Sequence, residues 1–203
     1  GDSIILNPGL KSNRDFIVDS CMEVVENYDV DAIHFDDYFY ISGVEGDKSA
    51  NWKRQQVDLF IEDLSEHIDT YNKANKKAVQ LGISPSGIYQ NGGYSTTPKY
   101  DANGNLTSPL ASNTAGFAHY GNYLYSDTLK WINEEWIDYI MPQTYWSLEQ
   151  TVASFGELSR WWSWTVRYKK VNLYLGMGIY MPASNSNWCK NKYEVRDQIL
   201  NAE

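Results

Sequence analysis

The sequence contains few cysteines, an excess of acidic over basic residues, and no long apolar run. Its two cysteines, Cys21 and Cys189, are too few for a disulfide framework or a four-cysteine metal site. No apolar stretch approaches the roughly 18 residues that a membrane-spanning helix needs. Lys and Arg number 17 against 26 Asp and Glu, which gives a net charge of −9. Such a surface repels phosphate backbones and anionic lipid headgroups, so neither nucleic acid nor a membrane surface is an expected partner.

Several motifs of common enzyme classes are also missing. The sequence has no Gly-x-Gly-x-x-Gly after an early strand and no Gly-x-x-x-x-Gly-Lys-Ser/Thr, which argues against dinucleotide and nucleotide binding. It has no Gly-x-Ser-x-Gly either, so a serine nucleophile on a tight turn is unsupported. Its three histidines, His34, His67 and His119, lack metal-ligand spacing. We therefore expect no metal and no cofactor.

Aromatic residues are abundant. The chain has 8 Trp, 16 Tyr and 6 Phe, which together make 15% of its 203 residues. Tyr and Trp rings carry a polar group and therefore suit partly solvated surfaces. An acidic chain rich in Trp and Tyr is typical of proteins that handle neutral sugars. The alternative is that large rings simply fill a core. Hydrophobic residues at 42% and charged residues at 21% indicate an ordinary globular chain.

Short apolar runs alternate with amphipathic stretches along the chain. Strands are predicted over residues 3–6, 30–35, 77–83, 136–141 and 171–176, and helices over residues 14–28, 51–72, 123–135, 148–168 and 191–201. Such alternation predicts parallel βα units. About five units are too few for a complete TIM-type barrel, which has eight and typically about 250 residues.

We therefore expect an α/β fold: one domain over residues 1–203 that forms an incomplete parallel (β/α) barrel and is a fragment of a larger one. Residues 84–120 are rich in Gly, Ser, Asn, Thr and Pro. They are expected to form a long loop or insertion at the carboxyl ends of the strands. The open edges of an incomplete barrel invite pairing with another chain, so self-association is also expected.

The clearest candidate for chemistry follows the second predicted strand. With an alternation of two, His34, Asp36 and Tyr38 face the same way, and barrel enzymes place their active sites at the carboxyl ends of strands. A buried charge needs partners, which favours a functional site over chance. The alternatives are a satisfied structural network or an exposed turn. A metal bound by His34, Asp36 and Asp37, as in a deacetylase, is a further reading, but the sequence shows no additional ligands.

The expected orientation and role of Asp37 are less clear than those of Asp36. Strand alternation directs it toward the helix layer unless the chain turns directly after Asp36. Two adjacent carboxylates repel each other, which can raise one pKa and suits a general acid. The alternative is that Asp37 caps a loop or pairs with a nearby Arg or Lys.

Polar and aromatic side chains follow the ends of three other predicted strands. Amides bind sugar hydroxyls and rings cover the apolar face of a pyranose, so these side chains are candidate sugar contacts. Together with His34 and Tyr38, the predicted substrate-binding residues are Ser84, Tyr89, Asn91, Gln143, Tyr145, Trp146 and Tyr180. For the rings, packing at the rim of the fold is an equally weighted alternative.

Several sequence blocks together resemble a known family. They are Leu6-Asn7-Pro8-Gly9, Arg14-Asp15-Phe16-Ile17-Val18, Tyr28-Asp29-Val30-Asp31-Ala32-Ile33-His34-Phe35-Asp36-Asp37-Tyr38-Phe39-Tyr40, Gly82-Ile83-Ser84-Pro85-Ser86-Gly87-Ile88 and Trp136-Ile137-Asp138-Tyr139-Ile140-Met141-Pro142-Gln143-Thr144-Tyr145-Trp146. In this order they resemble glycosyl hydrolase-like family ten over most of residues 4–180. Ala32 departs from the pattern, since the family commonly has Gly there.

The resemblance implies a (β/α)₈ barrel from secreted or cell-envelope proteins of bacteria that act on cell-wall or other polysaccharides. It also implies that this chain starts near the third barrel strand and ends near the seventh. The expected activity is therefore glycoside hydrolysis, with Asp36 as nucleophile or charge stabiliser and Asp37 as acid. Asp31, Asp36 and Asp37 also look distantly like the acidic strand of family-eighteen chitinases, which implies a substrate-assisted route. A non-catalytic sugar-binding barrel and a metal-dependent polysaccharide deacetylase are the alternatives.

Overall fold

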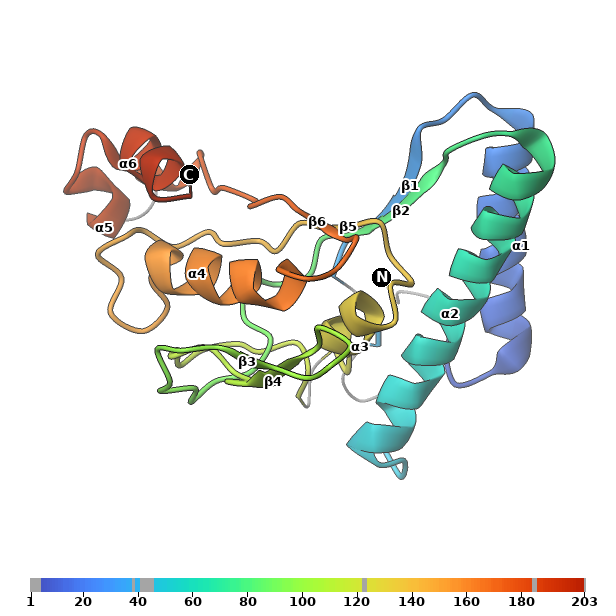
Figure 1. The fold of residues 1–203 in the computed structure, drawn as a ribbon, viewed down its shortest axis with the longest axis horizontal. Coiled ribbons are helices and arrows are strands. Elements are labelled where there is room, and N and C mark those ends of the chain that lie inside the picture. The colour runs from blue at the N-terminus through green and yellow to red at the C-terminus, as the bar shows by residue number, and fades with distance from the viewer. Residues whose placement is uncertain (1–4, 38, 41–45, 122–123, 184–185, 203) are drawn as a thin grey trace.

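A computed structural model describes residues 5–37, 39–40, 46–121, 124–183 and 186–202 (Figure 1). The fold is mixed α/β. Its elements in chain order are α1 (Lys11–Asn27), β1 (Ala32–Phe35), α2 (Ala50–Asn75), β2 (Gln80–Ile83), β3 (Lys99–Tyr100), β4 (Leu106–Ser108), α3 (Thr128–Asn133), β5 (Tyr139–Ile140), α4 (Phe155–Val166), β6 (Asn172–Leu173), the 3₁₀ turn η1 (Met181–Ala183), α5 (Ser186–Cys189) and α6 (Glu194–Ala202).

Four strands form one parallel sheet in the order β1-β2-β5-β6. Ala32 lies opposite Gln80 at the start of the β1–β2 pair, and β5 pairs in parallel with both β2 and β6. The alternation of strands and helices thus yields parallel βα units, as the sequence predicts, because each crossover helix returns the chain to the same end of the sheet. Within the described residues this sheet is open, and its edges are β1 and β6.

Four segments differ from the sequence-based expectation. Of the strand predicted over 3–6, residues 3 and 4 lie outside the described part, and Ile5 and Leu6 are not in a strand. The helix predicted from residue 148 begins only at Phe155, because the Ser154 side chain accepts a hydrogen bond from the Glu157 N–H and caps it there. Asp127 caps the start of α3 in the same way, so that helix also starts late. The predicted loop over 84–120 contains the antiparallel pair β3–β4.

Helices α1 and α2 pack side by side next to β1 and β2 (Figure 1). The longer helix, α2, starts where the Ser49 side chain accepts a hydrogen bond from the Trp52 N–H, and it ends at Lys76 in the left-handed conformation. Its buried apolar residues recur at helical spacing, with Val57, Phe60, Ile61, Leu64 and Ile68 on one face. Among the described residues, no helix has the length and apolar character to cross a membrane.

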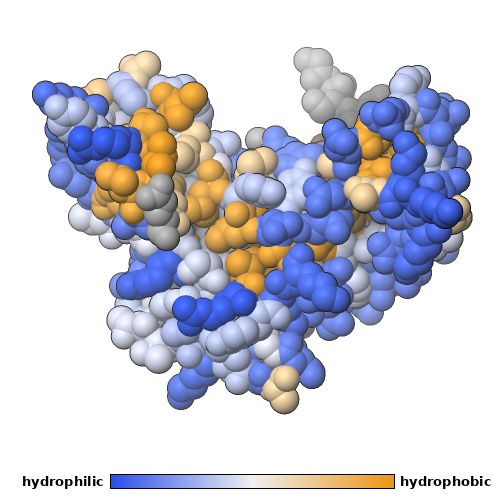
Figure 2. All heavy atoms as spheres, turned by 45° about the horizontal axis from the view of Figure 1, so that its top comes forward, coloured by the Kyte–Doolittle hydropathy of each residue, from blue (hydrophilic) through white to orange (hydrophobic). Residues whose placement is uncertain are grey.

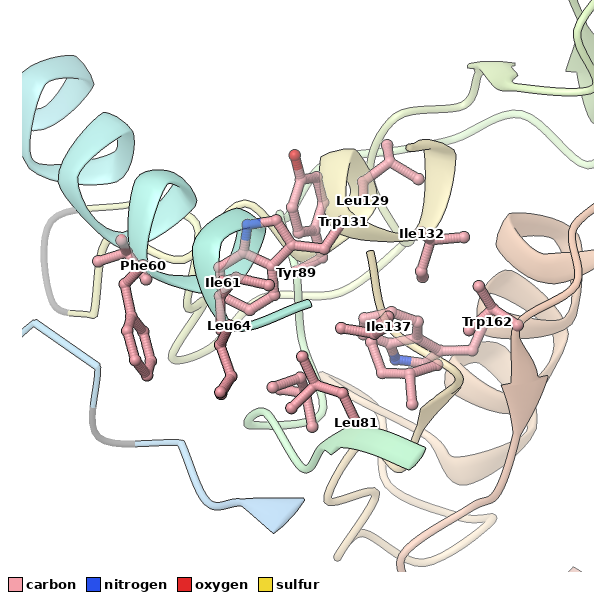
Figure 3. Packing of buried hydrophobic residues seen from close by; sticks show 14 of the residues in the cluster. Phe60, Ile61, Leu64, Leu81, Tyr89, Leu129, Trp131, Ile132, Ile137 and Trp162 are labelled. Atoms are coloured by element: carbon pink, nitrogen blue, oxygen red, sulfur yellow. The ribbon is translucent and has the colours of Figure 1, made fainter. Parts of the chain in front are cut away.

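The core lies between α2, the sheet, α3 and α4 (Figure 3). Trp131, Trp161 and Trp162 are fully buried, so part of the high aromatic content fills the core. Each indole N–H has a partner: Trp131 donates to Asp58 at 2.7 Å, Trp161 to the Pro109 carbonyl at 3.1 Å, and Trp162 to the Gly87 carbonyl at 2.8 Å. The last two bonds hold the long segment after β2 against α4.

A buried histidine fixes the same segment. His119 is fully buried, and its Nδ1 donates to the Ser86 carbonyl at 2.9 Å, which leaves Nε2 to accept from the Thr128 hydroxyl at 2.8 Å. The second bond requires the neutral ring, because a protonated ring carries a hydrogen on both nitrogens and Nε2 could then no longer accept. Burial accordingly lowers the pKa of His119 from 6.5 to about 3.

We expect the free energy of unfolding to fall as the pH drops below 6.5. The unfolded chain binds a proton at His119 there, but the folded chain does not until about pH 3, so protonation favours unfolding throughout this window. The expected loss is about 1.4 kcal/mol per pH unit below the unfolded pKa, hence about 2 kcal/mol between pH 7 and pH 5. Urea unfolding at both pH values measures it. A His119→Gln variant, unable to take up this proton, should lose the corresponding part of the pH dependence; an unchanged pH dependence would contradict the assignment.

Candidate active site

The loops that follow the strands meet at the carboxyl end of the sheet. The Ser84 N–H donates to the Phe35 carbonyl at 2.8 Å, which continues the pairing with β1 past the end of β2. Farther along, Gln143 pairs with Ser86 on one side and with Gly176 on the other. These pairings draw the segments after β1, β2, β5 and β6 into one region, as expected where parallel strands end at a common edge.

Asp36 and Gln143 are joined directly in this region. The Gln143 side-chain amide donates to Asp36 Oδ1 at 2.6 Å, although the two residues lie 107 positions apart in the sequence. The same Nε2 donates to the Ser84 carbonyl at 3.2 Å, which fixes the amide between the ends of β1 and β2. Asp36 is otherwise exposed and also accepts a hydrogen bond from the Asp37 N–H at 2.9 Å. The structure therefore brings together a predicted catalytic residue and a predicted sugar-binding residue.

Asp37 is more buried than Asp36. Its partial burial raises the pKa of its carboxyl above 3.8, and the negative charge of Asp36 raises it further. Adjacent carboxyl groups in different environments can separate into a proton-carrying group and an ionised one. The pair can therefore supply both an acid and a base.

Tyr145 and Tyr180 form a ring pair beside the two carboxyl groups. Their ring centroids are 5.9 Å apart with planes at 79°, and Tyr180 is 62% exposed. Partial burial raises the pKa of Tyr145, and the charges of Tyr180, Asp36 and Asp37 add to this effect. Because the charges of Asp36 and Asp37 both raise the pKa of Tyr145, its phenol lies within the range of these charges. The structure thus groups these two predicted residues with Asp36.

Trp146 is half-buried and packs against the core. Its ring covers Gly87 so closely that a Cβ there would lie 2.7 Å from Trp146 Cζ3. Part of the ring therefore serves the rim packing that sequence analysis named as the alternative. The residue nevertheless remains partly exposed.

The remaining predicted contacts lie in different places. Ser84 is buried, and its hydroxyl donates to the Met141 carbonyl at 2.9 Å, so the side chain ties β2 to the end of β5. Tyr89 is 5% exposed, stacks on Trp161 and donates to Asp127 at 2.8 Å. Burial raises the pKa of Tyr89 far above 10. No contact among the described residues connects it to Asp36.

Two further predicted residues also fall outside the Asp36 group. Asn91 lies within the long segment after β2, where its side chain donates to the Gly116 carbonyl at 2.9 Å and accepts from the Thr114 hydroxyl at 2.9 Å. Tyr38 lies outside the described residues.

His34 forms a pair with Tyr139, a residue that sequence reasoning missed. His34 Nδ1 and the Tyr139 hydroxyl are 2.9 Å apart, and the rings stack at 5.6 Å with planes at 17°. The Tyr139 ring lies against Gly82, where a Cβ would be 1.9 Å from Tyr139 Cζ. The signal that points to it is the spacing of two between Tyr139 in β5 and Met141 and Gln143 in the segment that follows.

Two further observations concern metal binding and the shape of the surface. Within the described part of the chain, no group of three His, Cys, Asp or Glu side chains is arranged to hold a metal ion. Figure 2 shows that the surface is hollowed between the α1–α2 end and the α5–α6 end of the molecule, with both apolar and polar residues along the hollow.

Comparison with known proteins finds one matching family and several relatives. A model of the family glycosyl hydrolase-like 10 matches residues 1–51 and 41–193. The protein named glycosyl hydrolase YngK from Bacillus subtilis (strain 168) is 36% identical over 219 aligned positions, which cover 100% of this chain and 40% of that protein. Glycosyl hydrolase DigH from Escherichia coli (strain K12) is 31% identical over 195 positions, covering 89% of this chain and 40% of DigH. The chain thus corresponds to 40% of the length of these relatives.

Proposed function

This chain belongs to the glycosyl hydrolase-like 10 family, and we propose that its Asp36–Asp37 site hydrolyses glycosidic bonds in a bacterial cell-wall or other polysaccharide. One observation carries the proposal: Gln143 holds the Asp36 carboxylate beside a second carboxyl whose pKa is raised, at the carboxyl end of a parallel sheet. This is where barrel enzymes place catalytic groups. The names of the relatives, both glycosyl hydrolases, agree with it.

The two carboxyl groups have different tasks in this mechanism. The Asp37 proton passes to the glycosidic oxygen as the bond between that oxygen and the anomeric carbon breaks. Asp36 stabilises the positive charge that develops on the sugar ring until water adds to the anomeric carbon, or forms a bond to the anomeric carbon that water then cleaves. In both cases the Asp37 carboxylate takes up the proton that the water releases, which restores the acid. The Gln143 amide orients Asp36, since it donates a hydrogen bond to the Asp36 carboxylate.

The rings beside the carboxyl groups would bind the sugar. Tyr145, Trp146 and Tyr180 can cover the apolar face of a pyranose, while the Tyr145 and Tyr180 hydroxyls and the Gln143 amide can bind sugar hydroxyls. The release of reducing ends from a panel of cell-wall and other polysaccharides tests the activity. Binding without release would favour the non-catalytic sugar-binding alternative.

Replacing Trp146 with Ala should weaken oligosaccharide binding by about 1–3 kcal/mol, because a stacked ring is a typical binding hot spot. Isothermal titration with a chitooligosaccharide or a peptidoglycan fragment measures the change. Tyr28→Ala is the control, since that ring is 67% exposed but precedes β1, at the opposite end of the strands. Unchanged affinity in Trp146→Ala would assign the ring to packing alone.

We also propose that the four-stranded sheet is part of a (β/α)₈ barrel, which further strands of a longer protein would close. The two edge strands, β1 and β6, and the apolar residues along the hollow of Figure 2 support this. An isolated chain of residues 1–203 should then self-associate through these edges, with an apparent mass that rises with concentration in light scattering. A constant monomer mass would contradict the self-association. A cell-wall substrate further favours a secreted or envelope location.

A further inference from the structure

The loop after β5 is bound at successive backbone positions by the C-terminal helices. The Trp188 indole N–H, from α5, donates to the Tyr145 carbonyl at 3.3 Å. The Gln198 side-chain amide, from α6, donates to the next carbonyl, that of Trp146, at 3.2 Å. Trp188 is 1% exposed and Gln198 is fully buried, so little water competes for these bonds.

A buried carboxylate completes this set of contacts. Glu194 at the start of α6 is 3% exposed, and its Oε1 accepts hydrogen bonds from the Leu148 N–H at 2.7 Å and from Gln198 Nε2 at 2.8 Å. Gln198 therefore joins the Glu194 carboxylate to the Trp146 carbonyl. The other carboxylate oxygen, Oε2, has no hydrogen-bond partner among the described residues.

These contacts act on the part of the loop that carries the proposed sugar-binding rings. At the start of the loop, the Thr144 N–H and hydroxyl both bind the Gly176 carbonyl, at 2.9 and 3.0 Å. The contacts from α5 and α6 follow directly. The backbone under Tyr145 and Trp146 is thus held from both sides, which reduces the conformational entropy that the loop would lose on binding a ligand.

We propose that Glu194 and Gln198 are positioning residues that hold Tyr145 and Trp146 in the orientation that binds sugar, an inference that rests on the proposed function. Neither residue touches the substrate. Both act through the loop backbone, so that the C-terminal helical segment sets the affinity of a site built on other strands.

Position 194 offers a matched pair of variants. Glu194→Gln keeps the Oε1 acceptor for Leu148 and Gln198, and it replaces only the oxygen that has no described partner. Glu194→Met has a similar volume but removes the acceptor. In Glu194→Met we expect amide hydrogen exchange at Leu148 to become about tenfold faster or more, because the protecting bond is gone. We expect oligosaccharide affinity to fall about tenfold, with KM raised and kcat nearly retained. Glu194→Gln should keep both properties near wild type.

Two results would overturn the proposal: wild-type exchange at Leu148 in Glu194→Met, or faster exchange with full affinity. If Glu194→Met does not fold, Gln198→Met tests the same idea, since it frees the Trp146 carbonyl and leaves the bond between Glu194 and Leu148 in place. Full affinity in a folded Gln198→Met would likewise count against it. If the wild-type protein binds no oligosaccharide at all, the proposed function fails and the positioning role falls with it, whereas the exchange rates still show whether the contacts hold the loop.

Discussion

Replacing Asp36 with Asn should reduce kcat by several orders of magnitude and leave substrate affinity nearly unchanged. The amide has almost the same shape as the carboxylate but carries no charge, so it cannot stabilise positive charge on the sugar ring or attack the anomeric carbon. Because that charge develops in the transition state, the loss falls on kcat rather than on binding. Steady-state kinetics on a defined oligosaccharide, together with titration of the inactive variant, separate the two effects.

Asp31→Asn is the matched control for this experiment. Asp31 is exposed and precedes β1 directly, so it lies at the opposite end of the strand from Asp36. Its substitution changes the net charge by the same amount and should leave turnover near normal. Near-normal turnover in Asp36→Asn would instead end the catalytic assignment of this residue.

Sequence patterns predicted the contact between Asp36 and Gln143 better than they predicted which aromatic side chains lie at the site and which lie in the core. Both residues follow parallel strands, and the ends of parallel strands share one edge, so their meeting follows from strand order alone. Tyr89 also follows a strand, but its segment returns to the core and stacks on Trp161. Side chains alternate with a period of two only within a strand. This alternation therefore does not predict the path of the long loop that follows.

Tyr139 illustrates a second limit. Its ring lies over Gly82 and reaches His34, and this depends on the register that aligns Gly82 with Tyr139 and His34 with Gly82. Register is a property of strand pairs, and no single strand reveals it. Similarly, the late start of α4 depends on whether Ser154 or an earlier residue caps the helix, which apolar spacing alone does not decide.

The role of Asp37 leads to the second large expected effect. If Asp37 protonates the departing sugar oxygen, Asp37→Asn should lower kcat by about 10²–10⁴-fold on ordinary glycosides. Substrates with a good leaving group, such as nitrophenyl glycosides, need little protonation and should lose far less. Comparing both substrate types in wild type and variant measures the difference. Equal losses on the two substrates would show that Asp37 is not the acid.

The pH dependence should follow from the environment of Asp37. An acid must be protonated to act, so activity should fall as the pH rises through the pKa of Asp37, which partial burial and then the Asp36 charge hold above 3.8. Asp37→Asn should remove this alkaline limb. Because Asp36→Asn deletes one of the two causes, the pKa of Asp37 should move down in that variant, which an NMR titration of the side-chain carboxyl can follow. If the pKa of Asp37 does not change in that variant, the charge of Asp36 does not raise it. The Asp36 charge would then not explain why Asp37 acts as the acid.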